Sequence, residues 1–158
     1  ELVERSAKPQ PTVAREVERL IEAGLLGREV RSGRRTVWAS TGSAIFAELR
    51  SILLKTIGPK PVIENHLARL QHIERAAIYG SWARRYHGEA GPLPQDVDLM
   101  VIGSPDVAAV RRAADDATRE LGRDVNVTVL ETGEWEQAGT GFIAQVKSGP
   151  LVDLDLAV

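Results

Sequence analysis

The sequence predicts an α/β (α+β) protein of two modules: a small one of helices and a β-hairpin, then a mixed β-sheet with flanking helices. Three observations support this fold class. Charge is distributed unevenly along the chain, a Gly- and Pro-rich break divides it, and strand and helix patterns follow one another in the second part. The 158 residues are enough for one ordinary domain or two small ones.

The uneven charge predicts modules with different partners. Residues 1–60 contain 11 Lys and Arg and 7 Asp and Glu, a net charge of +4, whereas residues 61–158 contain 9 and 15, a net charge of −6. Basic surface favours nucleic acid, while clustered carboxylates favour metal ions or simply keep a protein soluble. The break at Gly58-Pro59-Lys60-Pro61 predicts a first domain over 1–42, a linker helix over 43–60 and a second domain over 61–158.

Composition excludes several classes of protein. The chain has no cysteine, which rules out disulfides and thiolate metal sites and makes a reducing cytoplasm the expected location. The longest apolar stretches fall well short of the roughly 20 residues of a membrane-spanning helix, so no membrane contact is expected. The first five residues lack the features of a signal peptide and include no initiator Met, which suggests a fragment.

The front module begins with helical patterns. Glu1–Ala7 is expected to end a helix, because the prolines that follow cannot continue it. A second helix begins near Pro11 and ends near Gly24. Two short strands over 25–30 and 36–40 flank a basic turn, which predicts a β-hairpin. The apolar stripe of the second helix consists of Val13, Val17, Leu20 and Ile21.

Helix, tight turn, helix and basic hairpin is the order of a winged helix-turn-helix, and residues 11–26 resemble the recognition helix of ArsR- or MarR-type bacterial regulators. The resemblance covers residues 1–40 and lacks the family's first helix. It implies double-stranded DNA as the partner, with helix side chains at base edges and hairpin arginines at phosphates. A solvated helix face, or a module for protein contacts, is the alternative. The candidates are Thr12, Arg15 and Arg19 on the helix and Arg31, Arg34 and Arg35 on the hairpin.

The segment between the modules carries another helical stripe. It lies between Gly42 and Gly58 and predicts either a plain linker or a homodimer interface. After the break, Val62, Leu67, Leu70 and Ile73 predict one more helix. The apolar residues of the linker stripe are Ile45, Leu49, Ile52, Leu53 and Ile57.

Two features of the back module point to phosphate and metal chemistry. Gly80-Ser81 follows the expected strand Ala76–Tyr79 and precedes a helix over Trp82–Tyr86; such a turn lets a phosphate approach backbone N–H groups, although it is often purely structural. Asp96 and Asp98 begin an apolar strand, and alternation places both on one face. Adjacent carboxylates repel each other, which favours a cation such as Mg²⁺ with nucleotide phosphates in its shell; an exposed polar edge is the alternative.

Gly80-Ser-Trp-Ala-Arg-Arg85, a variable loop and Asp96-Val-Asp98 resemble the signature of the polymerase-beta-like nucleotidyltransferase superfamily in its minimal form, over residues 62–158. The resemblance implies transfer of a nucleoside monophosphate from an NTP to an acceptor hydroxyl, with Asp96 and Asp98 holding two Mg²⁺ (or Mn²⁺) ions. It also implies that Gly80 and Ser81 cradle the β- and γ-phosphates and that Arg84 or Arg85 neutralises them. The loop Gly88–Gln95 is expected to lie over the site as a flap.

In that family a third carboxylate on a neighbouring strand completes the site. In the strand over 124–129, valines alternate with Asp124, Asn126 and Thr128, and this second set is expected to face the acidic pair. Alignment by register puts Asn126 at the third position. An amide can ligate a metal but supplies no charge and cannot accept the nucleophile's proton. Asp124 is a candidate substitute, so turnover stays open.

The remaining patterns predict a helix over Pro105–Leu121 capped by Ser104, a helix over Glu134–Val146 and a short strand over Leu151–Leu156. Together these features favour a DNA-binding transcriptional regulator whose second module binds NTP and Mg²⁺ as an enzyme or a sensor. One rival is an active transferase whose front module recruits a protein or tRNA acceptor. Another is the antitoxin half of a toxin–antitoxin pair, with a toxin as protein partner.

Overall fold

The computed structural model describes residues 2–89, 91 and 94–156. The chain divides into two compact units, Glu1–Ile52 and Leu53–Val158, and the boundary falls inside helix α3 (Phe46–Ile57). Only Gly58 separates α3 from α4 (Pro59–Leu67). A Cβ at Gly58 would lie 2.2 Å from the backbone oxygen of Leu54, so a glycine is needed for this junction. None of the helices in the described ranges has the length and apolar character that crossing a bilayer requires.

The first unit contains the helices α1 and α2, a two-stranded hairpin and the first part of α3. Its turn residues Ser32 and Gly33 have φ values of 48° and 77°, as a tight two-residue hairpin turn requires, and the strands pair antiparallel, which confirms the predicted hairpin. Among the described side chains of residues 2–52, none is fully buried. The elements are α1 (Leu2–Ser6), α2 (Gln10–Glu22), β1 (Leu26–Arg31) and β2 (Arg34–Ala39).

The second unit is built on a mixed sheet, as the sequence predicts, and the structure shows four strands in the order β5-β4-β3-β6. β4 and β5 run parallel and are connected through α6 (Val107–Leu121), whereas β3 pairs antiparallel with both of its neighbours. The strands are β3 (Ile73–Tyr79), β4 (Asp96–Gly103), β5 (Asp124–Leu130) and β6 (Val152–Asp153).

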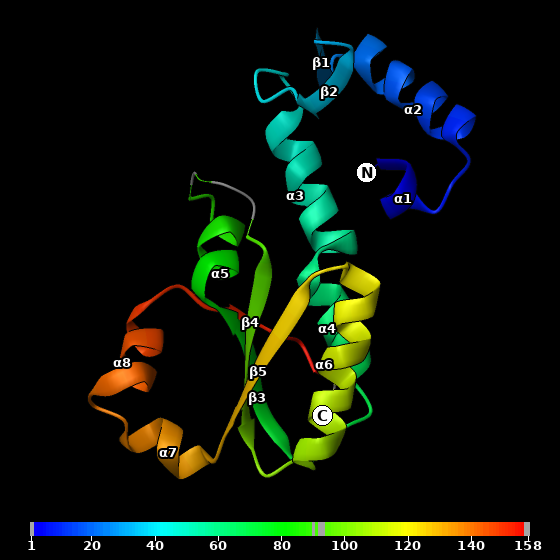
Figure 1. Cartoon of the computed structure of the whole chain (residues 1–158). Coiled ribbons are helices and arrows are strands. Elements are labelled where there is room, and N and C mark those ends of the chain that lie inside the picture. The colour runs from blue at the N-terminus through cyan, green and yellow to red at the C-terminus, as the bar shows by residue number, and fades with distance from the viewer. Residues whose placement is uncertain (1, 90, 92–93, 157–158) are drawn as a thin grey trace. The chain divides into compact units, whose positions relative to one another are not determined.

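Helices cover both faces of this sheet (Figure 1). α4 and α6 pack on one face, where Leu67, Leu99 and Val110 belong to the larger hydrophobic core. α7 (Thr132–Gln137) and α8 (Gly141–Ser148) lie on the other, where a smaller core contains Met100 and Val146. Because side chains alternate along β4, the face with the smaller core is also the face that carries Asp96 and Asp98.

Three predictions about helix ends are wrong. α6 is capped by Asp106 and not by Ser104: the Asp106 Oδ1 accepts hydrogen bonds from the backbone N–H groups of Ala108 (2.9 Å) and Ala109 (3.3 Å). The helix predicted over Glu134–Val146 is two helices, because the chain becomes extended at Ala138 and Gly139 follows. Ile73 begins β3 and does not extend the helix before it, which ends at Leu67.

Candidate functional site

The two aspartates lie where β4 begins. Asp96 and Asp98 are both half-buried, while Val97 and Leu99 between and after them are completely buried on the opposite face. The apolar residues therefore determine the orientation of the strand, and alternation places both carboxylates on the face of the smaller core. This is the arrangement that the sequence predicts for the pair.

The Gly80-Ser81 turn comes against this pair directly. Tyr79, the last residue of β3, is the antiparallel partner of Asp98, and α5 (Gly80–Tyr86) starts at the next residue. Gly80 has φ +68°, and a Cβ there would lie 2.6 Å from Oδ2 of Asp98. The positive φ makes any other residue strained at this position, and a Cβ there would also displace the Asp98 carboxylate. The turn and the carboxylate are therefore packed together without an intervening side chain.

β5 adds an amide to the acidic pair. The parallel register aligns Asp98 with Asn126 and Asp96 with Asp124. Nδ2 of Asn126 donates a hydrogen bond to Oδ2 of Asp96, at 3.2 Å. Asp124 is exposed, and in the described part of the chain no three or more His, Asp or Glu side chains gather as a metal site. The amide of Asn126 thus lies directly beside the acidic pair.

The carboxylate of Asp98 is electrostatically unfavourable in its ionised form. Burial and the negative charge of Asp96 together raise the pKa of Asp98 above its usual range. The hydrogen bond with Asn126 and the positive charge of Arg84 act in the opposite direction but do not cancel this shift. Burial also raises the pKa of Tyr79, with a smaller contribution from the charge of Asp98. A bound cation would relieve the repulsion at this site.

The two arginines of α5 contact the loop that follows the helix. Nε of Arg84 lies 3.6 Å from Oε1 of Glu89, and Nη1 of Arg85 donates to the backbone oxygen of Glu89. At the other end of the loop, Arg123 donates to the backbone oxygen of Pro94. Residues 90, 92 and 93 of the predicted flap lie outside the described residues. The described ends of this loop are therefore held by arginine contacts.

In the first unit, three of the six predicted DNA contacts take part in ion pairs on the surface. Arg15 and Arg19 both contact Glu16, at 3.5 and 3.1 Å, and Nε of Arg31 lies 2.7 Å from Oε1 of Glu29. Exposed pairs of this kind contribute at most about 1 kcal/mol, so an external phosphate can replace either carboxylate. Thr12 is half-buried in the first turns of α2.

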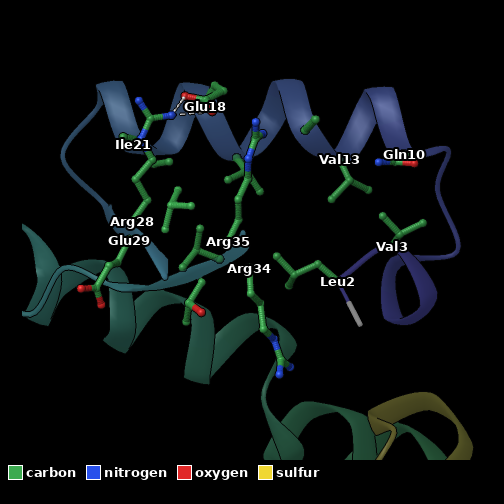
Figure 2. Close-up of a pocket in the computed structure, with 15 residues that line it drawn as sticks. Leu2, Val3, Gln10, Val13, Glu18, Ile21, Arg28, Glu29, Arg34 and Arg35 are labelled. Carbon is green, nitrogen blue, oxygen red and sulfur yellow. Dashed lines mark hydrogen bonds and ion pairs between the residues drawn. The ribbon is translucent and has the colours of Figure 1, made fainter. Parts of the chain in front are cut away.

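A cavity of about 860 Å³ lies between α1, α2 and the hairpin. Figure 2 shows Val13 and Ile21 of α2 above it, with Arg35 reaching across it toward α2 and Arg34 extending in the opposite direction. Adjacent strand residues point to opposite faces, which explains the divergence of the two arginines. The predicted hairpin arginines therefore do not form a single row.

Three residues near the acidic pair were missed by the sequence reasoning. Tyr79 packs edge-on against Phe142 of α8, with ring centroids 5.9 Å apart, and Arg123 holds the loop before β4. Tyr79 could have been noticed because it immediately precedes Gly80. Phe142 and Arg123 carry no such signal, since only the packing of α8 and the sheet register bring them to this end of the unit.

The donor groups at this site fit a Mg²⁺ ion that is bound together with phosphate. Mg²⁺ prefers oxygen ligands and in nucleotide sites takes one or two carboxylates, with phosphates and water supplying the rest. Asp96 and Asp98 provide two such carboxylates on one face. Burial, and after it the charge of Asp96, raise the pKa of Asp98, so a cation bound between the two carboxylates would favour their ionised forms.

No protein-family model matches the chain, and a comparison with curated protein sequences finds no match either. Among solved structures, a protein from Sulfolobus solfataricus described as a candidate nucleotidyltransferase is 21% identical in sequence. The match covers 63% of this chain and 86% of that one, with a TM-score of 0.34. Such a low TM-score does not establish a shared fold, so the chemistry of the site has to be inferred from its own side chains.

Proposed function

We propose that the second unit binds a nucleoside triphosphate together with Mg²⁺, as a nucleotidyltransferase-type module. The observation that carries the proposal is the closeness of the Asp98 carboxylate to Gly80, where an added Cβ would lie 2.6 Å from Oδ2, beside Asp96 on the same face. A metal ligand and a turn whose backbone a phosphate can approach are thereby adjacent. A Mg–triphosphate complex needs both of these features within one small region.

Each residue of the site has a distinct task under this proposal. Asp96 and Asp98 would hold Mg²⁺, which when bound supplies positive charge against the triphosphate and polarises the phosphoryl group. Gly80 and Ser81 would receive the β- and γ-phosphates. Arg84 would exchange its exposed contact with Glu89 for a phosphate oxygen, because a charge-assisted hydrogen bond to phosphate is stronger than a separated surface pair.

Transfer of the nucleoside monophosphate to an acceptor hydroxyl needs a group that accepts the hydroxyl proton. Asn126 cannot accept it, and its Nδ2 is engaged as a donor to Asp96. Asp124 is exposed and stands opposite Asp96 in the register. We therefore place nucleotide binding, as in a sensor, ahead of turnover, and keep the active transferase as the alternative that experiment must distinguish.

Calorimetric titration of the full chain with ATP, GTP, CTP and UTP, with and without Mg²⁺, tests the proposal. We expect binding that requires Mg²⁺. Incubation with α-labelled NTPs and candidate acceptors then distinguishes a sensor from a transferase. If no label is incorporated into protein or RNA, the result supports a sensor, whereas incorporation of label supports a transferase. Absence of binding for all four nucleotides in the presence of Mg²⁺ would exclude both.

The second candidate function is DNA binding by the first unit as part of a transcriptional regulator. It is favoured by the arginines at the tip of the β-hairpin, Arg31, Arg34 and Arg35, of which Arg31 and Arg34 flank the positive-φ turn. Backbone and arginine contacts to phosphate would give affinity without reading sequence, while Arg15 and Arg19 of α2 would contact base edges. Because the ion pairs of Arg15, Arg19 and Arg31 are exposed, each of these arginines can exchange its carboxylate partner for a group on DNA.

For the double variant Arg34→Glu/Arg35→Glu, we expect affinity for a duplex DNA to fall more than about tenfold at low salt, with a flatter dependence on salt concentration. Fluorescence anisotropy at several salt concentrations measures both quantities. Arg69→Glu, an exposed arginine of the second unit, is the matched control and should change neither. Equal DNA affinity for the double variant and the control would remove the hairpin from the proposal.

A further inference from the structure

An exposed aromatic side chain stands next to the proposed nucleotide site. Phe142, near the start of α8, is 52% exposed, although burial of its ring would be favourable. Its ring meets Tyr79 edge-on, with centroids 5.9 Å apart and planes at 74°. The chain has only two Phe and two Tyr residues, so half of them meet at this point. About half of this side chain is therefore accessible to a ligand, while its contact with Tyr79 restrains the ring.

Tyr79 connects this ring to the acidic pair. It is the register partner of Asp98, and it immediately precedes Gly80. Its hydroxyl also lies 3.5 Å from Oγ1 of Thr128, on the same face of the sheet as Asn126. Tyr79 is therefore adjacent to Asp98, to Gly80 and to the ring of Phe142.

The other aromatic residue on this side, Trp135 of α7, is arranged differently. Its ring lies between two cations, with Arg75 5.6 Å and Lys147 5.0 Å from the centroid. Trp135 also packs against the smaller core, so its environment is accounted for within the protein. Phe142 has no comparable cation contact among the described residues, and its only described ring partner is Tyr79.

We infer that Phe142, supported edge-on by Tyr79, is the stacking surface for the base of the bound nucleotide. This inference rests on the proposed nucleotide function and adds the part of the ligand that the carboxylates and the turn do not contact. Every base has an aromatic face, and stacking on a protein ring tolerates any of them. The larger face of a purine gives more contact, so ATP and GTP are expected to bind more tightly than CTP and UTP.

The test compares a ligand that has a base with one that has none. Calorimetry with the full chain and Mg²⁺ measures the dissociation constants of ATP and of inorganic triphosphate. We expect Phe142→Ala to weaken ATP binding about tenfold while leaving inorganic triphosphate unchanged. Phe142→Trp should retain ATP affinity, whereas Phe142→Leu, which keeps apolar volume but has no ring face, should behave as Phe142→Ala. Val107→Ala, which shortens another exposed apolar side chain of the same unit, is the control.

The outcomes separate this inference from the function on which it rests. Unchanged ATP affinity in Phe142→Ala, or equal loss of ATP and triphosphate, overturns the stacking role. Equal affinity of the unmodified protein for ATP and triphosphate also overturns it, while the phosphate and metal site stands. If neither ligand binds in the presence of Mg²⁺, the nucleotide site and the stacking surface fall together.

Discussion

Asp98→Asn is expected to abolish Mg²⁺-dependent nucleotide binding and at the same time to stabilise the folded protein slightly. The amide removes a charged metal ligand, so the affinity for Mg–ATP should fall by about 100-fold or more. It also removes the ionised carboxylate whose pKa is raised by burial and by Asp96. Calorimetry for binding and urea unfolding for stability measure the two effects on the same preparation.

The sign of the stability effect follows from the direction of the pKa shift. A carboxyl with a raised pKa in the folded state binds its proton more tightly there than in the unfolded chain. Its favourable contribution is complete below the unfolded pKa of about 3.9, and it is lost as the pH rises through the raised folded pKa. At neutral pH, Asp98→Asn should therefore increase the free energy of unfolding, by less than about 1 kcal/mol because the group is only half-buried.

Asp115→Asn is the matched control for this experiment, because Asp115 is an exposed carboxylate of α6 in the same unit. It should leave both nucleotide binding and stability within error. A variant Asp98→Asn that still binds Mg–ATP with the original affinity would contradict the assignment of Asp98 as a metal ligand. A clear decrease in stability would contradict the electrostatic description of the pair.

Asn126→Asp is expected to have the opposite combination of effects. The new carboxylate removes the hydrogen bond that Nδ2 donates to Asp96 and adds a third negative charge beside the pair. Without metal, the free energy of unfolding should fall by about 1–2 kcal/mol. With Mg²⁺ present the third carboxylate becomes a ligand, so the affinity for the ion should rise and the lost stability should return.

Thermal unfolding at increasing Mg²⁺ concentration measures this recovery. Asn65→Asp, at an exposed position of α4, is the control for adding a carboxylate to the second unit and should show no metal-dependent recovery. The Asn126→Asp variant should also be assayed for incorporation of labelled nucleotide, because the introduced carboxylate would provide the proton acceptor that the amide lacks. An Mg²⁺ response identical to that of the unmodified protein would show that position 126 does not face the metal.

The sequence was sufficient for features determined by local patterns. Alternation in β4 and β5 predicts which residues share a face, and the hydrogen bond from Asn126 to Asp96 agrees with that prediction. The hairpin was predictable because its turn needs residues that tolerate positive φ, and Gly33 provides one of them. Helix ends were less predictable, since Ser104 and Asp106 are both good capping residues and only the structure shows that Asp106 is the cap.

Local pattern by itself determined that this chain pairs a basic hairpin module with a mixed sheet carrying Gly80, Asp96 and Asp98, because spacing and alternation act within a few residues. Tertiary structure decided which of these groups touch. The contact of Asp98 with Gly80, the approach of Phe142 to Tyr79 and the loop contact of Arg123 join residues far apart in sequence. Such contacts depend on the order of strands in the sheet and on the packing of helices against it, and no local periodicity specifies either of these.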